Sequence, residues 1–424
     1  MPEGGLFAGH DWRVSPAPFV LGEDLAGQLE SLGRVLLQFY RAANLLYRRS
    51  FEGRQPEWVA RWLDGGKPAG LVELQRHAAF RHEVPRVIRP DLLLTEDGLR
   101  VTELDSVPGG IGLTAWLNQT YAELGFEVLG GARGMIDGFG SLMNPDGAVH
   151  LVVSDEAATY RPEMAWLAGQ LDPERWKLRD GTFDGFQDGD SVYRFFELFD
   201  LPQVPNAGRI FELAAERRLR LTPPPKPLFE EKMLFALLWN RNLRGFWRQE
   251  LGEGFLQRMS RLVPYTWLVD PTPLPPQGAI PELNLTDWGQ LEFLSHKERE
   301  LILKVSGFSP QAWGARGVYL GSDLSQADWA VAVRKAMAGF PNSPHVLQRY
   351  HKPALVDASW VDPGTGLEVA MKGRARLCPY YFVTGEGDAM RAKLGGVLAT
   401  ICPADKKIIH GMTDAVFAPC AAAV

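Results

Sequence analysis

One short stretch of the sequence, beginning at Arg89, gathers carboxylates and an arginine at spacings that suit chemistry. Two apolar runs flank residues 96–98 (Glu-Asp-Gly), and this pattern predicts a β-hairpin whose glycine takes the left-handed position of a three-residue loop. Such a loop places Asp91 opposite Glu103, and it also places Arg89 opposite Asp105. A two-residue loop would instead turn Asp91 to the other face. We therefore expect three carboxylates and one guanidinium on one side of two paired strands.

Opposed carboxylates in a sheet repel each other and destabilise it, by an amount within the roughly 0.2–1 kcal/mol that a cross-strand pair contributes to sheet stability. A hard divalent cation relieves that repulsion, because magnesium takes oxygen ligands. Asp91, Glu103 and Asp105 are therefore candidate metal ligands. The alternative is a solvated hairpin face on which Arg89 neutralises part of the charge. The Pro-Gly-Gly at 108–110 either lets backbone approach a ligand or simply makes a turn.

Two lysines in the second half of the chain are candidate phosphate-binding groups. Lys232 lies in the first turn expected of a helical stretch over 228–262, where a positive charge opposes the helix dipole. Lys304 lies on a strand that runs into a loop with three glycines. Such a loop can fold over a polyphosphate and offer backbone N–H groups, with the lysine as counter-charge. An exposed glycine-rich hairpin loop is the alternative. The glycines in question are Gly307, Gly314 and Gly317.

Length and composition bound the classes of protein to consider. A chain of 424 residues is too long for one compact core. The net charge of −6 provides no basic surface, which argues against nucleic acid or an anionic membrane as the main partner. The three cysteines form no CxxC pair, which favours a reducing compartment. No signal peptide or apolar run of membrane length is present, so we expect a cytoplasmic protein.

The hydrophobic pattern predicts an α/β first half and a second half of antiparallel sheets with helices. A stripe of apolar residues at intervals of three and four predicts a helix over 25–46. Further helices are expected over 114–124, 155–171 and 327–338. The expected strands are 150–154, 191–196, 301–305, 345–350, 367–371 and 375–383. The proline run at 222–227 is the natural boundary, which divides the chain into 1–225 and 226–424.

The order of these parts resembles the ATP-grasp carboxylate–amine ligases, in particular their circularly permuted branch typified by glutathionylspermidine synthetase. Arg89-Pro90-Asp91 and Glu103-Leu104-Asp105 are similar to the family's Arg-x-Asp and Glu-x-Asn. Residues 230–239 resemble the segment with the first ATP lysine. Lys304 and residues 307–317 resemble the second lysine and the phosphate-covering loop. Residues 348–350 resemble the hinge whose backbone holds adenine. Asp105 in place of asparagine, and Glu230-Glu231 before Lys232, depart from the family pattern.

The resemblance implies an ATP-grasp fold with the nucleotide between two subdomains, preceded by a pre-ATP-grasp-like α/β layer. It implies a ligase that uses ATP and Mg²⁺ to join a small-molecule carboxylate to an amine through an acyl phosphate, with release of ADP and phosphate. Arg89 would act in catalysis by orienting the acyl phosphate, or would merely hold Asp105. The alternatives are a nucleotide-binding module that has lost its chemistry and a small-molecule kinase. The implied nucleotide-binding residues are Lys232, Lys304, Gly307, Gly314, Gly317, Gln348, Arg349 and Tyr350.

Overall fold

The computed structural model describes residues 12–312, 314, 316–410 and 414–423, which divide into two compact units. Unit 1 contains the described residues up to Tyr40, then His77–Pro225, then Lys352 onward. Unit 2 contains Arg41–Arg76 and Lys226–His351. Helix α1 (Glu23–Phe51) begins in unit 1 and ends in unit 2, and it carries the apolar stripe that the sequence indicates.

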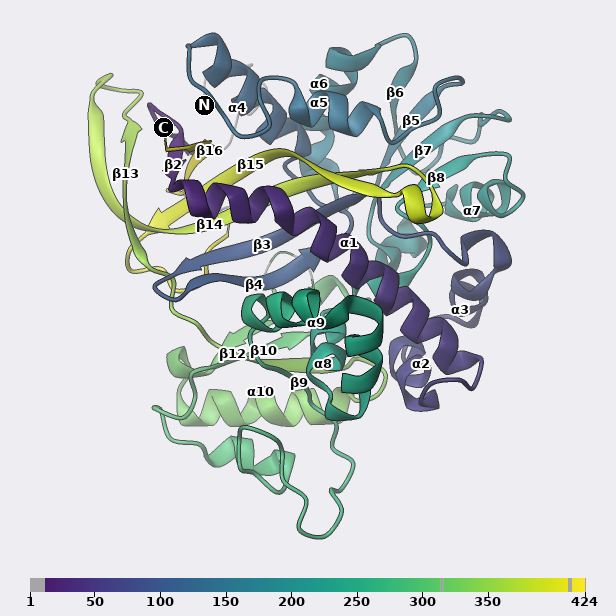
Figure 1. The fold of residues 1–424 in the computed structure, drawn as a ribbon, viewed down its shortest axis with the longest axis vertical. Helices are drawn as coiled ribbons and strands as arrows, with labels where there is room; N and C mark the ends of the chain where they lie inside the picture. The colour runs from purple at the N-terminus through teal and green to yellow at the C-terminus, as the bar shows by residue number, and fades with distance from the viewer. Residues whose placement is uncertain (1–11, 313, 315, 411–413, 424) are drawn as a thin grey trace. The chain divides into compact units, whose positions relative to one another are not determined.

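The largest sheet of unit 1 has eight strands and brings the two ends of the chain together. Its order is β1-β16-β15-β14-β3-β4, with β13 paired to β14 and β2 paired to β16 (Figure 1). The hairpin that the sequence singles out, β3–β4, thus forms one edge of this sheet. The strands of the eight-stranded sheet are β1 (Arg13–Val14), β2 (Phe19–Leu21), β3 (Val87–Thr95), β4 (Gly98–Asp105), β13 (Leu355–Val361), β14 (Glu368–Thr384), β15 (Arg391–Pro403) and β16 (Val416–Ala422).

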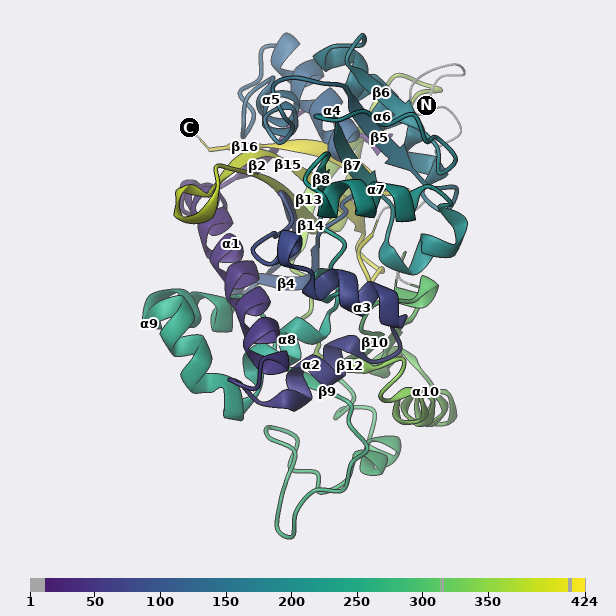
Figure 2. The same cartoon turned by 90° about the vertical axis from the view of Figure 1, so that its right-hand side faces the viewer.

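A second sheet of unit 1 is parallel, with the order β6-β5-β7-β8. Every residue of β5 and β7 is buried, as expected for parallel strands covered on both faces. Figure 2 shows α7 beside β8. The elements of this layer are β5 (Val149–Val153), α6 (Arg161–Leu171), β6 (Trp176–Arg179), β7 (Ser191–Phe195), α7 (Ala207–Ala215) and β8 (Arg220–Thr222).

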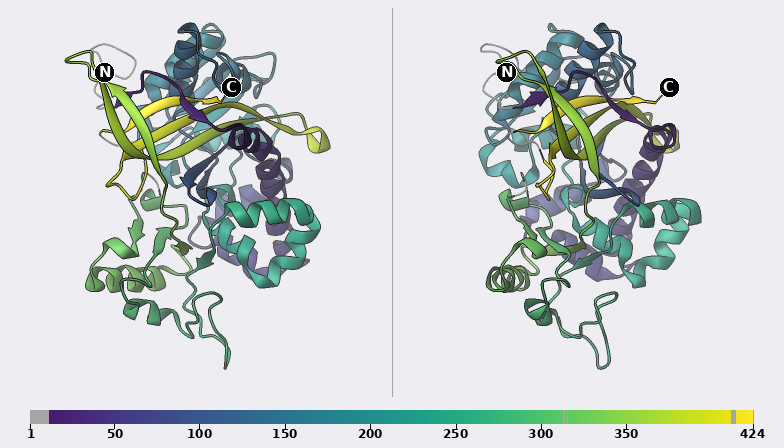
Figure 3. Two further views of the ribbon diagram at one scale, coloured as in Figure 1. Left: turned by 60° about the vertical axis from the view of Figure 1, so that its left-hand side comes forward. Right: turned by 90° about the vertical axis from the view of Figure 1, so that its left-hand side faces the viewer.

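One hydrophobic core joins the two sheets of unit 1. Helices α4 (Ile111–Glu123) and α5 (Gly134–Gly140) contact β15 of the large sheet and also α6 of the parallel layer. Phe139 of α5 packs against Tyr193 of β7 and Phe382 of β14, so the helical layer is shared by both sheets. The hairpin of β13 and the first part of β14 extends beyond this core (Figure 3), and its exposed apolar residues include Leu355 and Leu367.

Unit 2 is built on a four-stranded antiparallel sheet with the order β11-β10-β12-β9. Leu303, Leu347 and Trp267 lie in one row across it and pack with Trp329 of α10. Its elements are α2 (Glu57–Asp64), α3 (Ala69–Arg76), α8 (Met233–Trp239), α9 (Arg244–Leu262), β9 (Thr266–Leu268), β10 (Leu301–Val305), β11 (Val318–Leu320), α10 (Gln326–Gly339) and β12 (His345–Arg349).

Several element boundaries differ from the expectation. The two strands expected over 367–383 are one long strand, β14. The helix expected over 228–262 is divided, because α8 ends at Trp239 and α9 begins at Arg244. The residues from Lys352 onward belong to unit 1 and not to a C-terminal half, because β14–β16 pair with each other and β14 pairs with β3. Among the described residues, no helix has the length and apolar character needed to cross a membrane.

Candidate functional site

The β3–β4 hairpin has the pairing that the sequence predicts for its charged residues. Asp91 lies opposite Glu103, and Arg89 lies opposite Asp105. The guanidinium of Arg89 contacts both aspartates, since its Nε lies 2.9 Å from Oδ1 of Asp91 and one terminal nitrogen lies 3.0 Å from Oδ2 of Asp105. The expected gathering of charges on one side of the hairpin is confirmed for these three residues.

The turn that produces this pairing is not the predicted one. Thr95 pairs with Gly98, so the loop contains only Glu96 and Asp97. A two-residue loop alone would place Asp91 opposite Thr102. The register shifts by one residue between Asp91 and Leu92, however, and this β-bulge restores the predicted partner. The pairing was therefore right and the turn wrong, because an extra residue in β4 compensates for the shorter loop.

Asp91 is held by two arginines from different strands. Its Oδ1 contacts Arg89, and its Oδ2 accepts a hydrogen bond of 2.8 Å from Arg376 of β14. The thiol of Cys378 lies 3.5 Å from Oδ1. Burial by itself would raise the pKa of Asp91, but the two guanidinium groups outweigh that effect and hold the pKa below its usual value. Asp91 is thus an ionised carboxylate with both oxygens engaged by the protein.

Asp105 has a different electrostatic environment. Its Oδ1 accepts a hydrogen bond of 2.8 Å from the backbone N–H of Val107, and its Oδ2 contacts Arg89. Burial raises the pKa of Asp105 to about 6, and the nearby charge of Glu103 adds to the rise while Arg89 opposes it. Glu103 and Asp105 therefore repel each other, as the sequence argument requires of neighbouring carboxylates.

The predicted metal trio does not fit a cation in the arrangement that the structure has. Both oxygens of Asp91 already face guanidinium groups, which a bound cation would repel. In the part of the chain that the structure describes, no group of three or more His, Cys, Asp or Glu side chains is arranged to hold a metal ion. Glu103 and Asp105 remain the pair whose repulsion a cation would relieve, so metal binding by them stays a prediction.

Arg89 makes the contacts expected of a residue that holds Asp105. Its third contact is a hydrogen bond of 3.0 Å donated to the carbonyl oxygen of Gly109. Each of its three nitrogens thus faces an acceptor in unit 1, and the guanidinium links the two strands to the segment that follows them. A role in orienting an acyl phosphate stays a prediction.

The two glycines after the hairpin pack against tyrosines. A side chain at Gly109 would lie 2.3 Å from the ring of Tyr160, and one at Gly110 would lie 2.6 Å from the hydroxyl of Tyr380. Gly110 also has a φ of +82°, which a residue with a side chain rarely adopts. Of the two readings of Pro-Gly-Gly, the structure supports a turn with close packing.

The beginning of α4 is capped by a carboxylate of the protein itself. Glu163 of α6 accepts hydrogen bonds from the backbone N–H groups of Gly110, at 2.8 Å, and Leu113, at 2.9 Å. Burial raises the pKa of Glu163 to about 7, although these two hydrogen bonds favour its ionised form. The first N–H groups of the helix are therefore already bonded to a carboxyl group of the protein.

Lys304 lies on the face of the unit 2 sheet opposite its hydrophobic row. Because side chains alternate along a strand, Lys304 and Gln348 share that face while Leu303 and Leu347 point to the core. The ammonium group donates a hydrogen bond of 3.0 Å to Oε1 of Gln348, whose amide nitrogen donates to Thr266. Both Lys304 and Gln348 are buried.

Lys232 lies beside the loop that follows β10. It is the residue before α8, and its backbone N–H donates to the carbonyl oxygen of Ser306, at 2.9 Å. Its ammonium group donates to the carbonyl oxygen of Ala312, also at 2.9 Å. Ser306 comes directly after β10, so the two predicted lysines flank the beginning of the loop.

The three predicted loop glycines have two different structural roles. A side chain at Gly307 would lie 2.5 Å from the carbonyl oxygen of Glu230, and one at Gly317 would lie 2.5 Å from that of Gln311. These two glycines allow close backbone packing. Gly314 has a φ of +63° and no crowding, so it serves the turn. Two loop residues, 313 and 315, lie outside the described part of the chain.

The predicted adenine-binding segment forms the end of β12. The backbone N–H of Arg349 donates to the carbonyl oxygen of Tyr265, and that of Tyr350 donates to the carbonyl oxygen of Glu300. Both N–H groups therefore bond within unit 2, and adenine binding by the backbone stays a prediction. Unit 2 ends one residue later, at His351.

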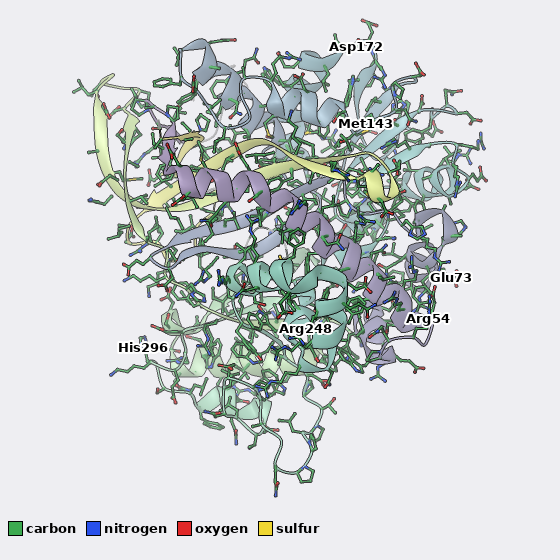
Figure 4. The ribbon with its side chains drawn as sticks, in the orientation of Figure 1. Arg54, Glu73, Met143, Asp172, Arg248 and His296 are labelled. Carbon is green, nitrogen blue, oxygen red and sulfur yellow. The ribbon has the colours of Figure 1, made fainter. Side chains whose placement is uncertain are left out.

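Sequence reasoning missed Arg376, Glu163 and Lys67, which contact predicted residues or their neighbours. Arg376 lies 285 positions from its partner Asp91, and no local pattern marks such a contact. His296 is exposed, and its Nε2 lies 2.9 Å from the carbonyl oxygen of Ser322 (Figure 4).

Comparisons with known proteins find similarity at the level of the fold. No family model and no curated protein matches the sequence. Among solved structures, a glutathione synthetase-like effector from Globodera pallida in its apo form matches with a TM-score of 0.55 and 11% identity, over 96% of this chain and 90% of that one. A proposed gamma-glutamylcysteine synthetase from Methylobacillus flagellatus is a weaker likeness, with a TM-score of 0.41 and 12% identity over 95% and 89% of the two chains. The chain shares the overall fold of the glutathione synthetase-like effector.

Proposed function

We propose that this protein is an ATP-dependent carboxylate–amine ligase with an ATP-grasp nucleotide site in circularly permuted order. The γ-phosphoryl group of ATP passes to a substrate carboxylate and leaves ADP. The amine nitrogen then attacks the acyl carbon, and phosphate departs as the amide forms. The fold shared with a glutathione synthetase-like protein supports the proposal, and so do the contacts of Lys232 and Lys304 in unit 2.

The observation that carries the proposal is the environment of Lys232 and Lys304. Both lysines are buried at the beginning of a glycine-containing loop, and each donates to a neutral acceptor: Ala312 O for Lys232 and Gln348 Oε1 for Lys304. A phosphate oxygen is a stronger acceptor for an ammonium group than either, because a charge-assisted hydrogen bond is roughly twice as strong as a neutral one. The lysines are thus suited to bind terminal phosphates.

Magnesium enters this proposal as the counter-ion of ATP. It neutralises charge on the phosphates during phosphoryl transfer. No step is assigned to Asp91, whose oxygens face Arg89 and Arg376.

A second candidate function is nucleotide binding without ligation. It is favoured by the same ion pairs of Asp91, because a protein that no longer performs the chemistry can stabilise the hairpin with arginines in place of a metal ion. A small-molecule kinase is the third reading, and its product distinguishes it from the other two.

Product analysis tests the proposal. ATP, Mg²⁺ and a panel of carboxylates are incubated with an amine panel, and ADP, AMP and phosphate are measured. We expect ADP and phosphate only when both an acid and an amine are present. Hydroxylamine, a small nucleophile, should trap the acyl phosphate as a hydroxamate when the acid alone is supplied. AMP and pyrophosphate, or a phosphorylated alcohol, would contradict the mechanism. ATP binding without turnover would leave the second candidate.

A lysine variant connects the activity to the site. Lys304→Ala should weaken ATP binding by about 1.5–3 kcal/mol, the contribution of a hydrogen bond to a charged group. The matched control is Lys335→Ala, since Lys335 is an exposed lysine of the same unit that contacts Tyr319. Equal ATP affinity in the two variants, measured by calorimetry, would rule out the role of Lys304.

A further inference from the structure

A fully buried ion pair includes Glu231, the residue before Lys232. The ammonium group of Lys67 contacts Oε1 of Glu231 at 2.6 Å, and both side chains are 0% exposed. Lys67 comes from the connection between α2 and α3, where a side chain at Gly66 would overlap the backbone of Asn342. The connection is thus seated closely on another part of unit 2, and Lys67 enters the interior from there.

The second oxygen of Glu231 connects the ion pair to the beginning of the loop. It accepts a hydrogen bond from the hydroxyl of Ser306. That hydroxyl accepts one of 2.9 Å from the backbone N–H of Met233, and the carbonyl oxygen of Ser306 accepts one of 2.9 Å from the N–H of Lys232. Lys232 and the residues on either side of it are therefore fixed to Ser306, the residue directly after β10.

The loop packs against the same pair. A side chain at Gly307 would lie 2.9 Å from Cδ of Glu231, and the ammonium group of Lys67 lies 5.7 Å from the centre of the Phe308 ring, within the range of a cation–π contact. The loop is contacted again at Ala312 by the ammonium group of Lys232. The Lys67–Glu231 pair therefore lies against the first residues of the loop and is adjacent in sequence to Lys232, whose ammonium group also contacts the loop.

We infer that Lys67 and Glu231 are positioning residues that hold Lys232 and residues 307–312 of the loop in the arrangement that binds nucleotide phosphates. This inference rests on the proposed function. It also accounts for Glu231, one of the residues that depart from the family pattern. Glu231 is buried, and its two oxygens contact Lys67 and Ser306. Its negative charge is therefore neutralised by Lys67 and does not oppose phosphate binding by Lys232.

Calorimetric ATP titration of Lys67→Met tests the inference in the full-length protein. Loss of the charge should raise the Kd for ATP about tenfold, as for one lost charge-assisted contact. The double variant Lys67→Met/Lys232→Ala should bind ATP no more weakly than Lys232→Ala alone, because Lys67 acts through Lys232. Losses that add in full would show that Lys67 does not position Lys232, and that part of the inference would be overturned.

Two further variants keep the test decisive. Lys67→Met/Glu231→Gln leaves no uncompensated charge in the interior, so it is used if Lys67→Met alone does not fold. It should also raise the Kd, and ATP affinity equal to that of the wild type would overturn the inference. Arg49→Met is the control, because it removes the ion pair with Glu250, elsewhere in the same unit, and should leave the Kd unchanged.

Hydrogen exchange separates this inference from the proposed function. Amides of residues 306–312 should exchange faster in Lys67→Met than in the wild type and in Arg49→Met, without any nucleotide present. If the wild type binds no ATP while this acceleration is seen, the proposed function fails and the positioning of the loop by the pair is upheld. Unchanged exchange in this segment would overturn the positioning role.

Discussion

Two guanidinium groups hold the carboxylate of Asp91, one from its own strand and one from β14. The side chain is 6% exposed, so its removal would leave two largely enclosed guanidinium groups, those of Arg89 and Arg376, without their shared partner. The stability of the hairpin therefore depends on the ionised form of this residue. Its ionisation is favoured in the folded state, because the arginines hold its pKa below the usual value.

Substitution of Asp91 measures that dependence. Asp91→Asn should lower the free energy of unfolding by about 3–5 kcal/mol, the cost of breaking a buried ion pair from one side. The measurement is urea unfolding at pH 7, with Asp97→Asn in the exposed turn as the control. The result would be the opposite if repulsion with Glu103 dominated, because removal of one carboxylate would then stabilise the hairpin.

Glu163 should make the stability depend on pH. Burial raises its pKa from 4.5 to about 7, so the folded protein binds this proton more tightly than the unfolded chain does. Its stabilising contribution is complete below pH 4.5 and is lost as the pH rises through 7. The change corresponds to roughly 3 kcal/mol.

The variant Glu163→Gln checks this sign. Glutamine does not titrate, so the free energy of unfolding of the variant minus that of the wild type should increase between pH 4.5 and 8. Urea unfolding across this range provides the measurement, with the exposed Glu30→Gln as the control. A difference that is constant with pH would show that the carboxyl group titrates normally.

At the scale of elements, α4 and α6 approach each other closely through a glycine. A side chain at Gly112 of α4 would lie 2.3 Å from the carbonyl oxygen of Glu163 in α6, and backbone cannot move aside as a side chain can. Gly169, within α6, has open space around it and is a matched helical glycine. Alanine substitutions at the two positions therefore distinguish the destabilising effect of crowding from the stabilising effect of higher helix propensity.

Alanine at these two glycines should have opposite effects. Gly112→Ala should lower the free energy of unfolding by about 1–3 kcal/mol, because it overpacks the contact between the helices. Gly169→Ala should raise it by about 0.5–1 kcal/mol through helix propensity. Thermal and urea unfolding would measure both. Stabilisation by Gly112→Ala would mean that α4 and α6 are packed less closely than the structure has them.

The elements show which features a sequence reveals by itself. The helix over 25–46 follows from hydrophobic periodicity, and the strand over 150–154 follows from a short apolar run, which a buried strand has in place of alternation. The sequence also predicts the pairing of Asp91 with Glu103, but the structure agrees only because a bulge in β4 compensates for a turn that is one residue shorter than predicted. Contacts such as that of Arg376 with Asp91 depend on tertiary pairing of β14 with β3, for which a single sequence has no local signal.

At the scale of the whole molecule, the chain does not divide at its proline run into two sequential domains. The sheet that contains the β3–β4 hairpin takes its central strands from residues after Lys352. A hairpin without these strands is at best marginally stable in water. Composition located the proline run but could not reveal that the chain returns to the first unit after His351.

Fragments of the chain test this arrangement. Residues 1–225 contain β3 and β4 but lack β14, β15 and β16, so we expect no cooperative thermal transition by circular dichroism. A protein that carries all three segments of unit 1, joined by flexible glycine–serine linkers, retains every strand of both its sheets and should unfold cooperatively. Limited proteolysis should digest the first and spare the second. Cooperative unfolding of residues 1–225 alone would show that the strands after Lys352 are not needed for the fold of the hairpin, and the sequential division would then hold.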